Sequence, residues 1–227
     1  MTKIRDKLQI IGTQIEQTSA EFNRTKNSVQ LLAVSKRHPV AAIQEAYQAG
    51  QRAFGENYVQ ELVEKAEALS TLNIEWHFIG PLQSNKTKQI ATTASWVHTI
   101  DRYKIAQRLN DQRPENLPPL SICIQVNISG EVSKSGVMPN GLTELAHKIS
   151  KLPNLSLRGL MAIPAPEGNF AKQRETFAKM SELKNQLNKQ GFKLDTLSMG
   201  MSGDMKAAIA EGATIARIGT AIFGARD

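Results

Sequence analysis

The stretch LLAVSKRHPV, residues 31–40, begins as a strand and becomes polar after four residues. Leu31 to Val34 form a short apolar run of the kind that is buried on both faces of a parallel sheet. Ser35 and Lys36 follow directly, and Pro39 then favours the first turn of a helix. Because a buried strand rarely ends on a charged side chain that has no use, Lys36 is the first candidate functional residue.

The pattern of residues 31–40, an apolar run followed by an amphipathic segment, recurs along nearly the whole chain. The runs that predict strands are 31–35, 53–56, 75–79, 96–100, 120–127, 157–162, 194–199 and 214–218. Helical patterns occupy 4–23, 39–49, 58–70, 85–92, 103–111, 139–152, 170–190 and 204–211. About eight strand–helix units indicate an α/β fold, a single TIM-type (β/α)8 barrel over residues 1–227 with an extra N-terminal helix. A doubly wound open sheet is the competing topology.

Three residues mark expected helix ends. Pro39 lies where the first turn of a helix would begin, and Gly50 lies just past its end. Asn57 precedes the helical segment YVQELVEKAEALS and is expected to cap it.

Composition narrows the class of protein. Hydrophobic residues make up 41% of the 227, but no apolar run is long enough to span a membrane, and the N-terminus mixes charges where a signal peptide would be apolar. We therefore expect a cytoplasmic protein without membrane contact. The single cysteine, Cys123, lies in the apolar run SICIQV and is expected to be a small core residue.

The net charge of +7 raises the question of an anionic partner. Basic residues are interspersed with acidic ones, and aromatic residues, on which bases stack, make up 5% of the chain. These features favour a solvated basic surface over a specific nucleic-acid site. Such a surface would attract small phosphorylated anions.

Barrel enzymes build their sites from the residues at the carboxyl ends of the strands. Here one strand end carries Lys36 and another carries Arg217, and the last two strands lead into turns that contain glycine. The segment SMGMSGD, residues 198–204, can present backbone N–H groups to a phosphate. A phosphate site beside an amine points to pyridoxal 5′-phosphate (PLP), whose aldehyde reacts with amines.

Six motifs occur in order over most of the chain. They are AVSK (33–36), FGENYVQE (54–61), WHFIGPLQSNK (76–86), LRGLMAIP (157–164), LSMGMSGDMKAAI (197–209) and ARIGTAIFG (216–224). Together they closely resemble the YggS/PROSC family of pyridoxal phosphate homeostasis proteins, which in turn resembles the barrel domain of alanine racemase.

The resemblance implies a (β/α)8 barrel that holds PLP as a Schiff base on Lys36. It also implies that Arg217 faces the pyridine nitrogen and that Asn57 and His77 line the cofactor. Ser202, Gly219 and Thr220 are the implied phosphate ligands, and Ser198 and Met199 complete the predicted cofactor-binding set.

Chemistry favours the same roles for Lys36 and Arg217. A Schiff base forms from a neutral amine, so Lys36 needs a lowered pKa, which partial burial and a nearby cation such as Arg37 or Arg217 would provide. An arginine can only donate to the ring nitrogen and leaves that nitrogen unprotonated, which makes the cofactor a poor electron sink.

Each candidate residue also has a purely structural interpretation. Lys36 could lie along the surface beyond its strand, and Arg217 could pair with Asp204 or Glu211. His77 and His98 could be packed barrel histidines, and no His, Cys and carboxylate spacing predicts a metal site. Met199 and Met201 could be core or pocket wall, and SMGMSGD could be an ordinary turn.

The resemblance to alanine racemase does not extend to that enzyme's separate C-terminal domain, which supplies a tyrosine acid/base. The tyrosines here, Tyr47, Tyr58 and Tyr103, all lie in helical patterns. We therefore predict a non-catalytic protein, a monomer, that takes part in PLP (vitamin B6) homeostasis by buffering PLP or delivering it to PLP-dependent apoenzymes. A small PLP-dependent racemase or lyase is the main alternative, and a nucleic-acid-binding protein is a third.

Overall fold

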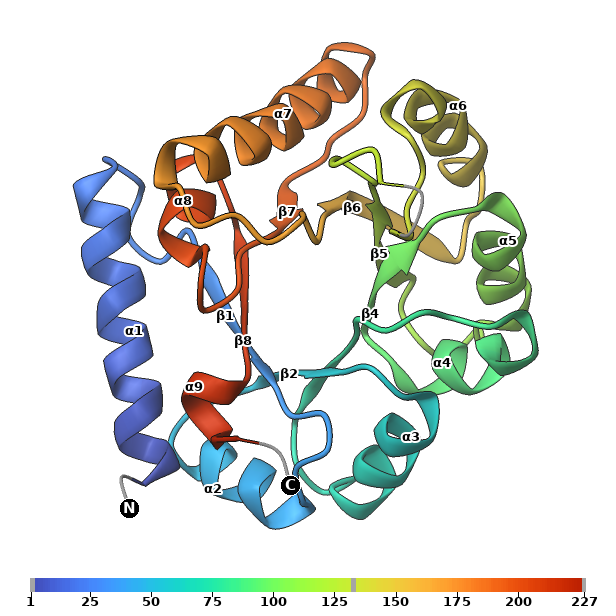
Figure 1. Ribbon diagram of the computed structural model, residues 1–227. Coiled ribbons are helices and arrows are strands. Elements are labelled where there is room, and N and C mark those ends of the chain that lie inside the picture. The colour runs from blue at the N-terminus through green and yellow to red at the C-terminus, as the bar shows by residue number, and fades with distance from the viewer. Residues whose placement is uncertain (1–2, 132–133, 226–227) are drawn as a thin grey trace.

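Eight parallel strands close into a barrel in chain order in the computed structural model, which describes residues 3–131 and 134–225 (Figure 1). The strands are β1 (Gln30–Val34), β2 (Ala53–Glu56), β3 (Glu75–Phe78), β4 (Trp96–Ile100), β5 (Leu120–Gln125), β6 (Leu155–Met161), β7 (Thr196–Ser198) and β8 (Ile215–Ile218). Strand β8 pairs with β1 and closes the barrel. The predicted (β/α)8 barrel is confirmed, and the open sheet is excluded.

Helices surround the barrel on its outer side (Figure 1). They are α1 (Ile4–Glu21), α2 (Val40–Gln48), α3 (Val59–Ala68), α4 (Thr87–Thr93, after a 3₁₀ turn at Ser84–Lys86), α5 (Tyr103–Gln112), α6 (Pro139–Ile149), α7 (Phe170–Lys189), α8 (Met205–Ala210) and α9 (Thr220–Phe223). Among these helices, none is long and apolar enough to cross a bilayer.

The predicted start and end of α2 are confirmed. Pro39 is its N-cap, and Gly50, just past its C-terminus, has a φ of +102°, a conformation that favours glycine. The prediction for Asn57 was wrong, because Tyr58 is the N-cap of α3 and the cap carries no side-chain hydrogen bond.

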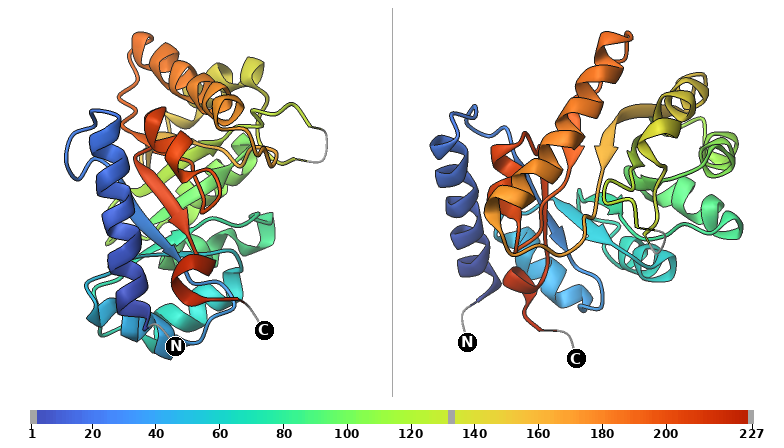
Figure 2. Two further views of the ribbon diagram at one scale, coloured as in Figure 1. Left: turned by 60° about the vertical axis from the view of Figure 1, so that its left-hand side comes forward. Right: turned by 45° about the horizontal axis from the view of Figure 1, so that its top comes forward.

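The N-terminal helix α1 covers the part of the barrel that the short helix α9 leaves open. Leu8, Ile11 and Ile15 of α1 belong to a buried apolar cluster with Ala33 of β1 and Ala216 of β8. Figure 2 shows α1 lying along this side of the barrel beside α8 and α9. The extra helix is therefore part of the hydrophobic core.

The strands place apolar side chains outward, against the helices, and several polar side chains inward. Phe54 of β2 and Phe78 of β3 are fully buried in the outer apolar clusters. His98 of β4 bonds to Ser198 of β7, and because β4 and β7 are not neighbours this bond crosses the barrel interior. Alternation along β4 and β7 therefore directs these two polar groups to the centre of the barrel.

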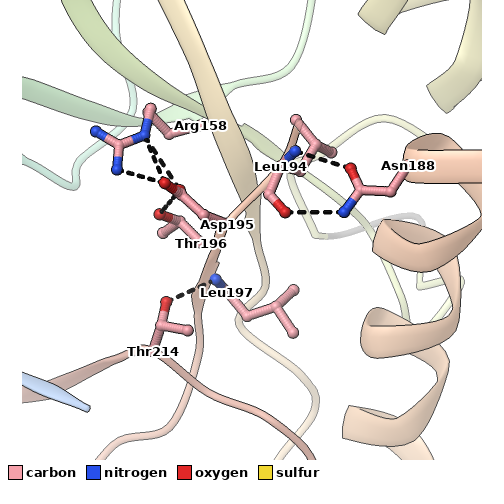
Figure 3. A network of polar contacts seen from close by, with 7 residues as sticks. All are labelled: Arg158, Asn188, Leu194, Asp195, Thr196, Leu197 and Thr214. Atoms are coloured by element: carbon pink, nitrogen blue, oxygen red, sulfur yellow. Dashed lines mark hydrogen bonds and ion pairs between the residues drawn. The ribbon is translucent and has the colours of Figure 1, made fainter. Parts of the chain in front are cut away.

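Strand β7 has three residues, and side chains supply hydrogen bonds on either side of it. Figure 3 shows this network, which joins Arg158, Asn188, Leu194, Asp195, Thr196, Leu197 and Thr214. The Asn188 side chain donates to the Leu194 carbonyl at 2.9 Å and accepts from its N–H at 2.8 Å. Arg158 of β6 donates two bonds of 3.1 Å and one of 2.5 Å to Asp195. These bonds fix the strand that carries Ser198 and leads into the 199–204 turn.

Candidate cofactor site

A cavity of about 260 Å³ lies at the carboxyl ends of β1, β2 and β8. It is lined by Val34, Lys36, Asn57, Ile79, Ile163, Met201, Ser202, Gly203, Arg217, Gly219 and Thr220. Six of the nine predicted cofactor-binding residues are in this set, although they come from four separate parts of the sequence. The carboxyl end of the strands is where barrels of this fold usually carry their active site.

Lys36 lies one residue beyond Ser35, at the end of β1. Val34 and Lys36 both line the cavity, and Ser35 between them is fully buried and faces the other way, toward β2 and α3. The Lys36 side chain is half-buried. The strand's two-residue period therefore continues into the turn and places Lys36 on the cavity side.

Charged groups of β2 and α3 hold the backbone on both sides of Lys36. The Lys65 ammonium of α3 donates to the Ser35 carbonyl at 2.9 Å, to Glu56 at 2.9 Å and to Glu61 at 2.8 Å. Glu56 also accepts from the Ser35 hydroxyl at 2.6 Å, and Glu61 accepts from the Arg37 N–H at 2.8 Å. Arg37 has a φ of +62°. We call Ser35, Glu56, Glu61 and Lys65 the clamp.

The clamp was missed in the sequence analysis. Glu56 is fully buried, and its desolvation raises the pKa of its carboxyl, although Lys65 and Ser35 donate to it and oppose this shift. Partial burial also raises the pKa of the Glu61 carboxyl. The hydrogen bonds from Lys65 and from the Arg37 N–H outweigh this effect, so the pKa of Glu61 is lowered. The signal was a charged residue at the end of the buried strand AFGE, with a lysine nine residues later on the next helix.

Asn57 follows β2, lines the cavity and has one unsatisfied polar atom. Its side-chain oxygen Oδ1 is buried without a hydrogen-bond partner within the described structure. Gly80, after β3, packs directly against it: a Cβ at Gly80 would lie 1.9 Å from the Asn57 carbonyl oxygen. Glycine at position 80 therefore allows the ends of β2 and β3 to approach, and the buried oxygen leaves an acceptor for a ligand.

Arg217 of β8 is buried at the base of the cavity and held by three hydrogen bonds. It donates to the Ser198 carbonyl at 2.5 Å, to the Ser198 hydroxyl at 2.9 Å and to the Ala162 carbonyl at 2.8 Å. Burial lowers its pKa to about 10, and nearby Asp204 opposes this shift. Arg217 is thus charged at neutral pH. Glu211, one of the ion-pair partners considered for it, pairs with Arg174.

The turns after β7 and β8 bring hydroxyl and glycine residues to the same side of the cavity. Ser202 and Gly203 lie in the first turn, and Gly219 and Thr220 lie in the second. Gly200 directs the first turn with a φ of +93°, and a Cβ there would lie 2.7 Å from Ala208 Cβ. This cluster supplies hydroxyl and backbone donors of the type that binds phosphate.

The other three predicted residues, His77, Ser198 and Met199, are fully buried and do not line the cavity. Met199 packs in the outer apolar cluster, whereas Met201 is partly exposed and lines the cavity wall. Ser198 bonds Arg217, and His77 stacks on Trp96 with an interplanar angle of 4°. The structure thus gives His77 the surroundings of a packed barrel histidine.

Cys123 is a buried free thiol, as predicted, and burial raises its pKa. A thiol with a raised pKa is a poor nucleophile. Over residues 3–131 and 134–225, no cluster of three or more His, Cys, Asp and Glu side chains is arranged to hold a metal ion.

Fold and site together define a class of protein: a parallel eight-stranded barrel with a lysine on its first strand end, an arginine on its last strand and a donor-rich turn between them. Residues 13–227 match the family model "Alanine racemase, N-terminal domain". The chain is also 59% identical over 231 residues to the pyridoxal phosphate homeostasis protein of Vibrio alginolyticus, covering 100% of this chain and 99% of that one.

Two further relatives agree with this assignment. The pyridoxal phosphate homeostasis protein of Escherichia coli is 53% identical over 230 residues, covering 100% of this chain and 95% of that one. PipY of Synechococcus elongatus, in a structure with PLP bound, is 40% identical with a TM-score of 0.80, covering 92% of this chain and 100% of that one. The chain belongs to the family of pyridoxal phosphate homeostasis proteins.

Proposed function

We propose that this protein binds PLP in the cavity through a Schiff base with Lys36 and takes part in PLP homeostasis without turning over a substrate. The observation that carries the proposal is the single cavity that brings Lys36, Arg217 and the 202–203 and 219–220 turns together. The name shared by the relatives and the PLP-bound structure of PipY support it.

The residues of the cavity fit this cofactor. Bound PLP supplies an aldehyde that combines with an amine, and Lys36 is the amine that lines the cavity. Arg217 donates toward the ring nitrogen, and Ser202 and Thr220 donate hydroxyls to the phosphate. Asn57 Oδ1, buried without a partner in the described structure, accepts a hydrogen bond from the ligand.

A non-catalytic role rests on the groups that line the cavity. Among the described lining residues there is no tyrosine, histidine or carboxylate that could serve as a second acid/base beside Lys36. Tyr47 accepts from the Asn73 N–H, Tyr58 accepts from Arg37, and Tyr103 packs on the core. Arg217 keeps the ring nitrogen unprotonated, which limits electron withdrawal by the cofactor.

The role in the cell follows from reversible binding. A protein that holds PLP on an exchangeable lysine and lacks a second acid/base group keeps the free aldehyde low and returns it to apoenzymes. We propose that it does so as a monomeric cytoplasmic protein.

Titration of the purified protein with PLP, followed by visible absorption, tests the proposal. We expect one PLP to bind per chain and to give an absorption band at a longer wavelength than that of free PLP. We expect Lys36→Ala to lack this band. Lys26→Ala, which replaces a lysine remote from the cavity, is the control. Wild-type protein that shows no such band would contradict the proposal.

A further inference from the structure

A continuous chain of hydrogen bonds crosses the barrel interior from Arg217 to Glu75. Arg217 donates to the Ser198 hydroxyl at 2.9 Å, and this hydroxyl lies 2.8 Å from His98 Nδ1. His98 Nε2 lies 2.9 Å from His77 Nδ1, and His77 Nε2 lies 2.5 Å from Glu75 Oε1. The chain starts at a cavity residue and ends on a carboxylate that is 40% exposed at the start of β3.

The two ends of this series of hydrogen bonds restrict which atom donates in each bond. A guanidinium can only donate and an ionised carboxylate can only accept. With both histidines neutral, one arrangement gives every bond a donor and an acceptor: Ser198 donates to His98, His98 Nε2–H donates to His77, and His77 Nε2–H donates to Glu75. In this arrangement both histidines carry their proton on Nε2.

The surroundings of the histidines agree with this arrangement. Burial lowers the pKa of His77 despite the opposing effect of Glu75, and burial, His77 and Arg217 lower the pKa of His98 well below its usual value. The hydrogen bond from His77 lowers the pKa of Glu75, and Arg158, the charged group that faces it from β6, acts in the same direction. Arg217 and Glu75, at the two ends, are therefore charged, and the two histidines between them are neutral.

We propose that Ser198, His98, His77 and Glu75 are positioning residues for Arg217: their one-directional relay points the Ser198 lone pair at the guanidinium and holds it in the cavity. The relay thereby sets how tightly Arg217 holds a ligand ring with an acceptor nitrogen. This consequence rests on the proposed PLP site, whereas the direction of the relay does not.

Nitrogen-15 NMR of histidine side chains, recorded on the protein without PLP, tests the direction. The chain has four histidines, and we expect His77 and His98 to be neutral Nε2–H tautomers between pH 6 and pH 8, roughly the range over which a free imidazole titrates. A protonated Nδ1 on either ring would overturn the relay. In Glu75→Gln the new amide can donate as well as accept, so we expect a mixture of tautomers at His77, and an unchanged spectrum would contradict the role of Glu75.

PLP affinity tests the effect on Arg217. Ser198→Ala removes one acceptor of Arg217 and the donor to His98, so the Kd for PLP should rise roughly three- to thirtyfold. Ser19→Ala, at a buried serine of α1, is the matched control and should leave the Kd unchanged. A wild-type Kd in Ser198→Ala would overturn the inference.

Failure of the relay and failure of the proposed PLP binding can be told apart. If Ser198→Ala does not fold, Glu75→Gln decides: unchanged tautomers and a wild-type Kd would overturn the relay. Wild-type protein that binds no PLP would contradict the proposed function, while the tautomers still test the relay's direction.

Discussion

Lys65 donates a 2.9 Å hydrogen bond to the carbonyl oxygen of Ser35, the residue that directly precedes Lys36. The same ammonium bonds Glu56 and Glu61, so one buried cation ties the end of β1 to β2 and α3. The backbone next to Lys36 is therefore held by a residue that does not line the cavity.

Replacing Lys65 with Met should destabilise the fold by about 3 to 5 kcal/mol, because it leaves the buried Glu56 without its cationic partner. The double variant Lys65→Met/Glu56→Gln removes both charges and should recover part of this loss. Urea unfolding of the two single variants and the double variant gives the coupling free energy. Additive effects of the two changes would contradict the clamp.

Ser202→Ala and Thr220→Ala test the phosphate site. Each removes one hydroxyl donor to an anion, so PLP affinity should fall roughly ten- to a hundredfold while the melting temperature stays close to wild type. Pyridoxal, which lacks the phosphate, should bind these variants and the wild type equally. Equal losses for both ligands would place the phosphate elsewhere.

The buried histidines predict a loss of stability in acid. His77 and His98 have lowered pKa values, so near pH 6.5 and below the unfolded chain takes up protons that the folded barrel does not. The free energy of unfolding should thus decrease as the pH is lowered below about 6.5, by up to about 1.4 kcal/mol per pH unit for each histidine.

His98→Phe provides the comparison for this pH dependence. It removes one of the two buried histidines, so its stability should fall less steeply between pH 6.5 and 5.5 than that of the wild type. His147→Phe, at an exposed histidine of α6, is the control. Urea unfolding at each pH gives the slopes, and identical slopes for wild type and His98→Phe would show that His98 titrates normally in the folded protein.

Because no tyrosine, histidine or carboxylate is among the described residues that line the cavity, we predict that amino acids are not consumed. They should alter the absorption of the PLP-loaded protein by competing with Lys36 for the aldehyde, and chiral chromatography with mass spectrometry after long incubation should find them unchanged. Steady multiple turnovers that disappear in Lys36→Ala would instead support a small racemase or lyase.

The sequence predicted the barrel because each of its eight strands carries a local signal. The predicted strands 53–56 and 96–100 match β2 and β4, since apolar runs and turn residues mark their ends. Strand β7 is shorter than predicted because the apolar run continues through Met199, which packs outward after the strand has ended. The four-residue helix α9 has too few residues to show a period.

The site could be predicted in part for a similar reason. Lys36 and Arg217 lie near the carboxyl ends of β1 and β8. These two strands are parallel neighbours in the closed barrel, which brings both residues to the same cavity. The relay could not be predicted, because it depends on pairs such as His98 and Ser198, 100 residues apart, whose contact across the barrel leaves no local pattern. Asn57 was expected to cap a helix, but close packing against Gly80 holds it at the cavity.

Reduction of the PLP-loaded protein with borohydride, followed by peptide mass mapping, tests the central claim most directly. Borohydride makes the linkage between PLP and a lysine permanent, so the peptide that contains the modified lysine gains the mass of the reduced cofactor. We predict that this mass lies on Lys36 and that Lys36→Ala takes up none at equal PLP concentration. Wild-type protein in which Lys36 is unmodified while another lysine carries the cofactor would contradict the account.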